Sequence, residues 1–211
     1  MVESRIQTRK ARMAHKRQPV QERSRQRREE ILRATAALLE QVGFDDLTTI
    51  LIAREMAISV GSLYHYFPNK QAILYAMGEQ WLEQYSVALE DVAALPLEQL
   101  DQQQFVAALV PRLLTNYQDQ RGMLPLVQAM WSVPELRDLD EAHDDMVISR
   151  LSNMFRRLGL AHSRGELERR ARMCLEMTHA LLLSITEQTS TKAKRSAADL
   201  QALCLTLLNQ P

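Results

Sequence analysis

The sequence predicts an all-α protein: an N-terminal three-helix helix-turn-helix domain followed by a C-terminal helical domain. Apolar residues recur three and four positions apart along most of the 211 residues, which is the periodicity of amphipathic helices. The seven prolines and six glycines are few, and several separate the periodic segments. The hydrophobic fraction of 46% is sufficient for a substantial core.

Positive charge is concentrated at one end of a chain whose net charge is zero. Residues 1–28 contain ten Lys or Arg and two Glu, a net charge of +8, so the rest of the chain carries −8. This polarity indicates a polyanionic partner at the N-terminal end only. We expect residues 1–20 to form a disordered basic arm that follows phosphates or enters a minor groove. A solvated leader, or a true start at Met13, is the alternative.

Several functional classes lack their sequence signatures. No apolar run reaches the roughly 18 residues of a membrane span, and no apolar signal core follows the basic N-terminus. Cys174 and Cys204 lie far apart, which favours a reduced cytoplasmic protein; a disulfide between helices is the minor alternative. We find no catalytic triad signature or phosphate loop, and predict no enzymatic activity, catalytic residues or cofactor. A metal at His143 would need a partner such as His179, which no spacing enforces, so no metal is predicted.

Residues 48–70 have the pattern of two short helices joined by a tight turn, followed by the start of a third. Thr48 or Thr49, Ser59 and Asn69 stand where the N-caps of these helices are expected. Such side chains accept hydrogen bonds from backbone N–H groups that have no partner within the helix. The segment therefore predicts a helix-turn-helix.

The second of these helices, expected over residues 60–66, has one buried side. Leu63 and Phe67 are four positions apart and share a face. Ser62, Tyr64 and His65 point away from that face. A short helix with this division is shaped for a DNA major groove.

The run Gly61-Ser62-Leu63-Tyr64-His65-Tyr66-Phe67-Pro68-Asn69-Lys70 resembles the DNA-binding domain of TetR-family transcriptional regulators. The resemblance extends upstream through Ile31 to Gly43 and downstream into the helix from Asn69. The remaining chain resembles the family in helical layout only. One departure is Ala57, where the turn usually carries glycine. Alanine there either adopts a left-handed conformation, at a cost of about 1 kcal/mol, or tilts the turn.

DNA contacts are assigned to the second helix and its flanks. Tyr64 would contact a phosphate or a thymine methyl group, and Ser62 and His65 would contact base edges or backbone. Thr49 and Lys70 would bind phosphates, which position the helix without reading sequence. The complete predicted set is Thr49, Ser59, Val60, Gly61, Ser62, Tyr64, His65 and Lys70.

We divide the chain into a basic arm (1–20), a helix-turn-helix domain (21–68), a connecting helix (69–94) and a ligand-binding and dimerisation domain (95–211). The first helix is expected over 21–42, with Gly43 as its terminator. Helices of the last domain are expected at 100–118, 122–133, 134–158, 165–189 and 196–209.

The last two expected helices are too apolar for a single buried stripe. In the first of them, one side contains Leu167, Cys174 and Leu182, and another contains Met173 and Met177. Such a helix must bury both sides. We expect one side to cover the core of the subunit and the other to form a two-fold dimer interface. One large monomeric core is the alternative; the family resemblance implies the dimer.

The middle helices contain aromatic residues and methionines that suit an adaptable apolar cavity. Taken singly, each is equally consistent with an ordinary core residue. As a set they resemble the family's effector pocket, with Tyr117, Asn153 and His143 as polar anchors and Trp131 as a further member. The predicted ligand-binding residues are Trp81, Tyr85, Leu113, Tyr117, Leu126, Met130, Met146, Asn153 and Met177.

These observations predict a ligand-responsive dimeric regulator that binds double-stranded DNA. The resemblance implies a repressor, released from a palindromic operator by a small apolar or amphipathic effector. Two alternatives remain: a nucleic-acid packaging protein that binds through the basic arm, and a small-molecule sensor or enzyme with an incidental helix-turn-helix.

Overall fold

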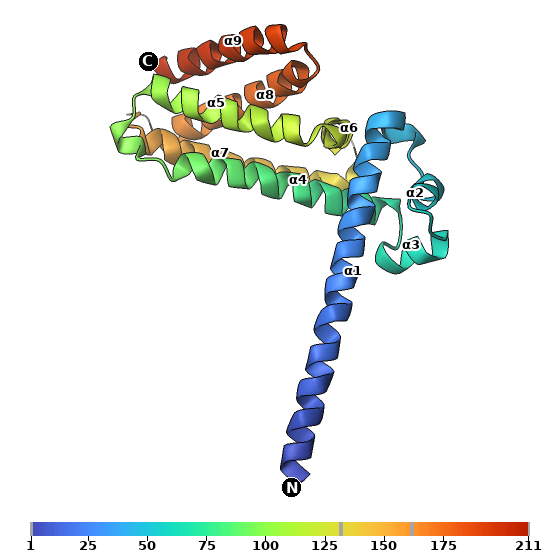
Figure 1. Ribbon diagram of the computed structural model, residues 1–211. Coiled ribbons are helices and arrows are strands. Elements are labelled where there is room, and N and C mark those ends of the chain that lie inside the picture. Colours follow the sequence, from blue (N-terminus) through green and yellow to red (C-terminus); the bar gives the residue numbers. More distant parts are fainter. Residues whose placement is uncertain (1, 131–132, 161–162, 211) are drawn as a thin grey trace. The chain divides into compact units, whose positions relative to one another are not determined.

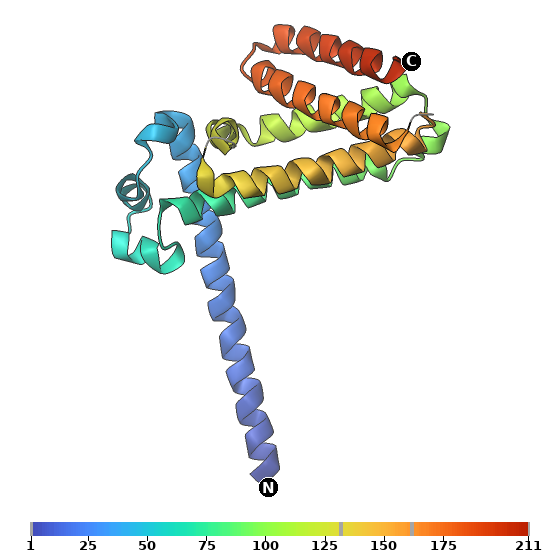
Figure 2. The same cartoon turned by 180° about the vertical axis from the view of Figure 1, so that it is seen from behind.

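The computed structural model describes residues 2–130, 133–160 and 163–210, with side chains from residue 21 onward. Within these ranges all regular secondary structure is helical, which confirms the predicted fold class (Figures 1 and 2). Contacts divide the chain into two compact units, Met1–Leu74 and Tyr75–Pro211. The elements are α1 (Val2–Asp46), α2 (Thr49–Glu55), α3 (Val60–Tyr66), α4 (Lys70–Ala93), η1 (Leu97–Gln99), α5 (Gln102–Asp119), η2 (Arg121–Met123), α6 (Leu124–Ala129), α7 (Pro134–Arg157), α8 (Arg164–Thr186) and α9 (Ser190–Asn209).

α1 is longer than the sequence predicts. It begins at Val2, so the backbone of residues 2–20 is helical where a disordered arm is expected. That segment is rich in Arg, Lys, Gln and Ala, all good helix formers, and it adds turns to a helix already nucleated downstream. Gly43 interrupts the helical geometry, with φ 77° and ψ −179°, at the predicted end of the first helix.

The core of the first unit is formed by α1, α2 and α3, in which α2 packs against both others. Ile31, Leu39, Ile52 and Leu63 are completely buried there. Ile50, expected on the apolar side of α2, is instead 69% exposed. At about 100° per residue, a position two before Ile52 points to the opposite side of the helix.

α4 begins in the first unit, at Lys70, and continues into the second. The Asn69 side chain accepts a 2.8 Å hydrogen bond from the Ala72 N–H, which confirms its predicted capping role. The apolar side expected for this helix is buried throughout. It consists of Ile73, Leu74, Met77, Trp81, Tyr85 and Leu89.

In the second unit, α8 packs against α5, α7 and α9, and α5 also packs against α9 (Figure 1). α4 and α7 lie side by side in both views and are joined by two arginines of α7 (Figures 1 and 2). Arg150 donates to the Ser86 hydroxyl at 2.7 Å and pairs with Glu90 at 2.9 Å. Arg157 donates to the Ala93 carbonyl oxygen at 2.6 Å. These hydrogen bonds and the ion pair hold α7 against α4.

Several helix boundaries differ from the sequence prediction. α9 begins at Ser190 after an extended Thr189, although the predicted helix begins at residue 196. The residues in between include Lys and Ala, which favour a helix despite their polarity. α6 ends at Ala129, whereas 122–133 is the predicted helix; Trp131 and the next residue lie outside the described part of the chain. Within the described residues, no helix combines the length and apolarity needed to cross a membrane.

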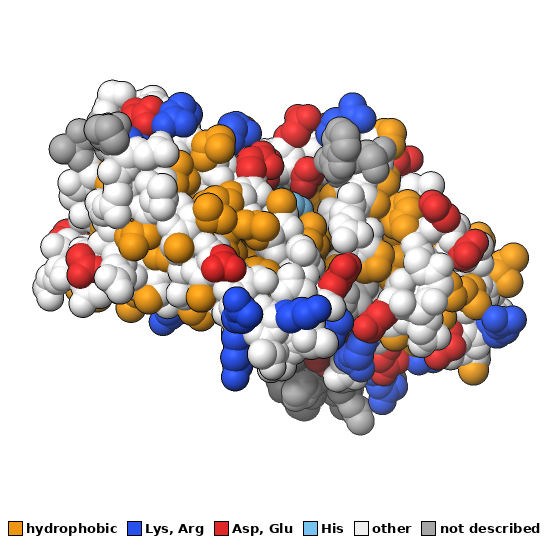
Figure 3. All heavy atoms as spheres, turned by 90° about the horizontal axis from the view of Figure 1, so that it is seen from above, with side chains coloured by type: hydrophobic (Ala, Val, Ile, Leu, Met, Phe, Trp, Pro, Cys, Tyr) orange, Lys and Arg blue, Asp and Glu red, His pale blue; other side chains and the backbone are white. Residues whose placement is uncertain are grey.

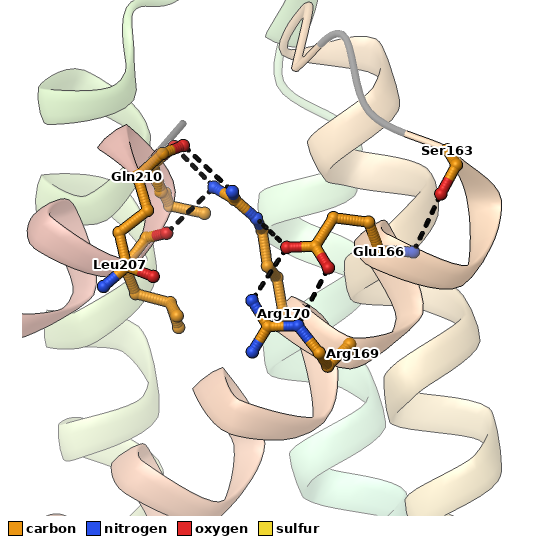
Figure 4. A network of polar contacts seen from close by, with 7 residues as sticks. Ser163, Glu166, Arg169, Arg170, Leu207 and Gln210 are labelled. Carbon is orange, nitrogen blue, oxygen red and sulfur yellow. Dashed lines mark hydrogen bonds and ion pairs between the residues drawn. The ribbon is translucent and has the colours of Figure 1, made fainter.

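A buried arginine holds α8 to the end of α9 (Figure 4). Arg170 is completely buried, and its Nε donates to a Glu166 carboxylate oxygen at 2.8 Å. Its other nitrogens donate to the carbonyl oxygens of Leu207 at 3.1 Å and Gln210 at 2.9 Å. Carbonyl groups at a helix C-terminus have no partner within the helix, and a cation there also suits the helix dipole. Hydrogen bonds from Arg169 and Arg170 lower the pKa of Glu166 to about 2.

Replacing Arg170 with Met should lower the free energy of unfolding by roughly 3 kcal/mol, because the last carbonyl groups of α9 would lose their buried donor. Arg164→Met is the control, since Arg164 is exposed and forms only a surface pair with Glu168. Urea unfolding at one fixed protein concentration measures both. Equal stability of the two variants would contradict the assigned role.

Candidate nucleic-acid interface and ligand cavity

The predicted caps Thr48 and Ser59 stand at the starts of α2 and α3. Thr48 Oγ1 accepts from the Leu51 N–H at 3.1 Å, and Ser59 Oγ accepts from the Ser62 N–H at 3.0 Å. Ala57 adopts the left-handed conformation, with φ 51°. The Ala57 and Ile58 N–H groups donate back to carbonyl oxygens of α2, at 3.1 and 3.0 Å, in the standard pattern of a glycine-terminated helix. Alanine therefore accepts the strained conformation and the turn keeps its usual hydrogen bonds.

α3 has the two sides that the sequence predicts. Leu63, together with Phe67 just after the helix, is buried in the first unit. Ser62, His65 and Tyr64, the last 47% exposed, lie on the opposite side. Three predicted contact residues are therefore available to a partner without any rearrangement of the core.

Two predicted phosphate-binding residues also make contacts within the protein. Thr49 Oγ1 lies 3.3 Å from the Tyr64 hydroxyl, which links α2 to the exposed side of α3. Lys70 Nζ donates to the Phe44 carbonyl oxygen at 3.1 Å and lies 5.0 Å from the Phe44 ring centroid. One ammonium group has three donors, so this bond leaves N–H groups for a phosphate.

Arg28 has a positioning role that the sequence does not reveal. Its Nη1 donates to the carbonyl oxygen of Tyr66 at 2.7 Å, and its guanidinium group lies 4.2 Å from the Phe67 ring centroid. Both contacts hold the end of α3 against α1. The partners are 38 positions apart, so no local pattern could have indicated them.

The second unit contains a cavity of about 470 Å³, between side chains of α4, α5, α6, α7 and α8 and the residue that follows α6. Its volume is within the range of roughly 300–1,000 Å³ that is usual for small-molecule sites. It is lined by Trp81, Leu82, Tyr85, Tyr117, Val127, Gln128, Met130, Asp140, His143, Asp144, Leu175, Glu176, His179 and Leu183.

Four of the nine predicted ligand-binding residues line this cavity: Trp81, Tyr85, Tyr117 and Met130. The anchors Tyr117 and His143 also line it, whereas Asn153 is exposed on α7 and lies outside the lining. At about 100° per residue, Asn153 points away from the side of α7 that bears His143. The other four are core or half-buried residues outside the lining, namely Leu113, Leu126, Met146 and Met177.

The acidic side of the cavity was not predicted. Asp140 and Asp144 of α7 and Glu176 of α8 contribute carboxylates to the lining. The signal that could have identified the α7 carboxylates is their spacing of four, in register with buried Leu136 and Val147 on the same helix.

Burial shifts the pKa values of two carboxylates and two histidines that line the cavity. It raises the pKa of Asp144 to about 6, with Asp140 and Glu176 adding to the effect, and it also raises the pKa of Asp140. Burial lowers the pKa of His143 to about 4, and it lowers the pKa of His179. At neutral pH both histidines are uncharged, so the cavity has a negative electrostatic character.

Residues that line the cavity make aromatic and polar contacts with one another. The Trp81 and Tyr117 rings meet edge to face at 4.9 Å, and Tyr85 and His143 do so at 5.1 Å. The Tyr117 hydroxyl lies 2.7 Å from His179 Nδ1, in a hydrogen bond. His143 Nδ1 is buried and has no hydrogen-bond partner among the described residues. No three described His, Cys, Asp or Glu side chains are grouped to hold a metal ion.

The exposed second helix of a helix-turn-helix, in a chain with a separate cavity-bearing helical unit, defines the class of DNA-binding transcriptional regulators. Residues 31–77 match the family of bacterial regulatory proteins, tetR family. Residues 101–208 match the tetracyclin repressor-like C-terminal domain. The chain belongs to the TetR family of transcriptional regulators, which are not enzymes.

Curated relatives carry the same description. The HTH-type transcriptional regulator BetI of Stenotrophomonas maltophilia (strain R551-3) is 31% identical over 152 residues, covering 68% of this chain and 74% of that protein. BetI of Pseudomonas aeruginosa (strain LESB58) is 30% identical over 138 residues, covering 62% of this chain and 68% of that protein.

Solved structures share the fold. The TetR-family regulator PfmR from Thermus thermophilus superposes with a TM-score of 0.68 at 21% identity, covering 85% of this chain and 99% of that one. A transcriptional regulator from Rhodococcus sp. Rha1 gives a TM-score of 0.70 at 15% identity, covering 86% and 95%.

Replacing Asp144 with Asn should raise the melting temperature at pH 7.5 and have little effect near pH 4. Because the folded protein holds this proton more tightly than the unfolded chain, ionised Asp144 opposes folding increasingly as the pH rises from about 4 through 6. Thermal unfolding across this range gives the difference between variant and parent. Asp145→Asn, at an exposed position on the same helix, is the control. A gain that does not depend on pH would contradict the assigned burial.

Proposed function

We propose that this protein is a repressor that binds a palindromic operator as a homodimer and dissociates when a small molecule occupies the cavity. The proposal rests on one observation: a single helix, α4, begins next to α3 and also contributes residues to the cavity. This helix starts four residues after the end of α3, at Lys70, and runs to Ala93 without interruption. Trp81 and Tyr85 on the same helix line the cavity.

DNA reading is assigned to the exposed side of α3. Tyr64 contacts a phosphate or thymine methyl group, and Ser62 and His65 reach base edges or backbone. Gly61 and Val60 allow close approach at the helix start, beside the Ser59 cap. Thr49 and Lys70 bind phosphates. Residues 2–20 bring further positive charge, which strengthens binding to any duplex in a salt-dependent manner.

Dimerisation is assigned to α8 and α9. Their predicted inner residues, among them Cys174 and Leu182, are buried in the single chain. On their outer sides Met173 is 49% and Leu203 48% exposed. The side of the molecule that α9 occupies in Figure 1 shows groups of hydrophobic side chains when viewed from above (Figure 3). Apolar surface of this kind on a two-sided helix supports a two-fold interface.

Regulation is assigned to α4. A ligand that contacts Trp81 and Tyr85 favours one position of this helix, and its first turn carries the Asn69 cap and the Lys70 bond to Phe44. Movement of α4 changes the separation of the two reading helices in a dimer. A coupling of roughly 1–3 kcal/mol is enough to weaken operator binding 5- to 150-fold. The free thiols of Cys174 and Cys204 support a reducing, cytoplasmic location.

Tyr64→Ala should weaken operator binding by about 1–3 kcal/mol and leave stability unchanged, because the side chain is half exposed and contributes little to the core. Fluorescence anisotropy with a selected operator and a random duplex measures the loss. Tyr75→Ala, at an exposed tyrosine of α4, is the control. Equal losses on both duplexes would favour a packaging protein that binds without sequence preference.

Leu203→Asp should produce monomers, because a carboxylate at the centre of an apolar two-fold interface meets its own copy. Val87→Asp, at a similarly exposed apolar residue of α4, should remain dimeric. Sedimentation velocity at several concentrations distinguishes the two. A Leu203→Asp variant that stays dimeric would remove α9 from the interface.

A further inference from the structure

The lining of the cavity bears negative charge and no Lys or Arg: Asp140, Asp144 and Glu176 contribute carboxylates to it. None of the three forms a salt bridge with a described residue, although the charge of Arg172 acts on Asp144 from outside the lining. Asp140 and Asp144 are half-buried, whereas Glu176 is exposed. A half-buried carboxylate without an ion-pair partner is costly, so a ligand that supplies positive charge beside Asp140 and Asp144 is stabilised there.

Other residues of the lining are aromatic and apolar. Trp81, Tyr85 and Tyr117 are buried and lie edge to face in one cluster. Aromatic rings attract organic cations through their negative faces and also bury apolar surface. Met130 and Leu183 extend the apolar lining. The cavity therefore suits a ligand that combines a cationic group with an apolar body.

The carboxylates of the lining distinguish between kinds of cation. A carboxylate accepts charge-assisted hydrogen bonds from an N–H group. A protonated amine supplies such N–H groups to the carboxylates, whereas a quaternary ammonium group supplies none.

We propose that the effector is a protonated amine carrying an aromatic or aliphatic body. Its ammonium group binds at the acidic lining, where Asp140 and Asp144 contribute half-buried carboxylates, and its apolar body packs on Trp81, Tyr85 and Tyr117. This inference rests on the proposed effector function of the cavity and specifies its ligand class. The size of the cavity, about 470 Å³, accommodates a ring with a short alkyl chain.

Four matched probes test the class by calorimetric titration of the full chain at pH 7.5. They are 4-phenylbutylamine, its N,N,N-trimethyl derivative, 4-phenyl-1-butanol and 4-phenylbutyrate. We expect the amine to bind at least about tenfold more tightly than the alcohol, since its hydrogen bonds are charge-assisted, and the carboxylate to bind most weakly. The trimethyl derivative should bind less tightly than the amine.

Substitutions in the lining test where the ammonium group of the probe binds. Asp144→Asn should weaken binding of the amine about tenfold and leave binding of the alcohol within about twofold, because only the charge-assisted contact is lost. Asp145→Asn, exposed and outside the lining, should change neither. Retained binding of the alcohol verifies that each variant is folded.

The outcomes separate this inference from the proposed function. If the alcohol or the carboxylate binds as tightly as the amine, if the trimethyl derivative binds as tightly, or if no probe binds, the ligand class is overturned. The operator and dimer experiments are unaffected by such results. Tight, Asp144-dependent binding of the amine without any change in operator affinity would instead uphold the ligand class and contradict the proposed regulation.

Discussion

One constraint underlies the structure: α4 is a single uninterrupted helix whose residues belong to both compact units. Its first turn is fixed by the Asn69 cap and by the hydrogen bond from Lys70 to the Phe44 carbonyl oxygen. Farther along, Trp81 and Tyr85 are buried beside the cavity. The backbone of α4 is continuous from Lys70 to Ala93. This covalent continuity underlies the proposed link between ligand and DNA.

The two units are built by different means. In the first, local caps and a few long contacts, notably those of Arg28 with Tyr66 and Phe67, place α3 with one side free. In the second, buried polar groups are prominent: Arg170 holds the end of α9, and carboxylates and histidines line the cavity. Groups buried without full compensation cost stability, and such costs are often found where a protein binds a ligand.

The features that the sequence predicts correctly are local. Caps at Thr48, Ser59 and Asn69 depend on a side chain and an N–H group three residues away. The left-handed Ala57 is one of the two alternatives that the sequence left open for the turn. Periodicity also identifies the buried side of α4, because one helix face is read from spacing alone.

The features that it misses depend on tertiary contacts. Arg28 and Arg170 meet partners 38 to 40 positions away, and the lining role of Asp140 and Asp144 requires knowledge of how α7 meets α8. Asn153 lies outside the cavity lining. Which side of α7 faces the cavity depends on tertiary packing, which composition does not reveal. The extra turns of α1 and the early start of α9 reflect helix propensity in polar segments, which hydrophobic periodicity cannot detect.

The central claim is that two copies of α3, brought together by a dimer through α8 and α9, read two half-sites together. The most direct measurement is the affinity for a selected operator into which about 5 base pairs, half a helical turn, are inserted between the half-sites. The account predicts that affinity falls to nearly the level of non-specific duplex, because one reading helix is rotated away from its groove. Unchanged affinity for the lengthened site would contradict it.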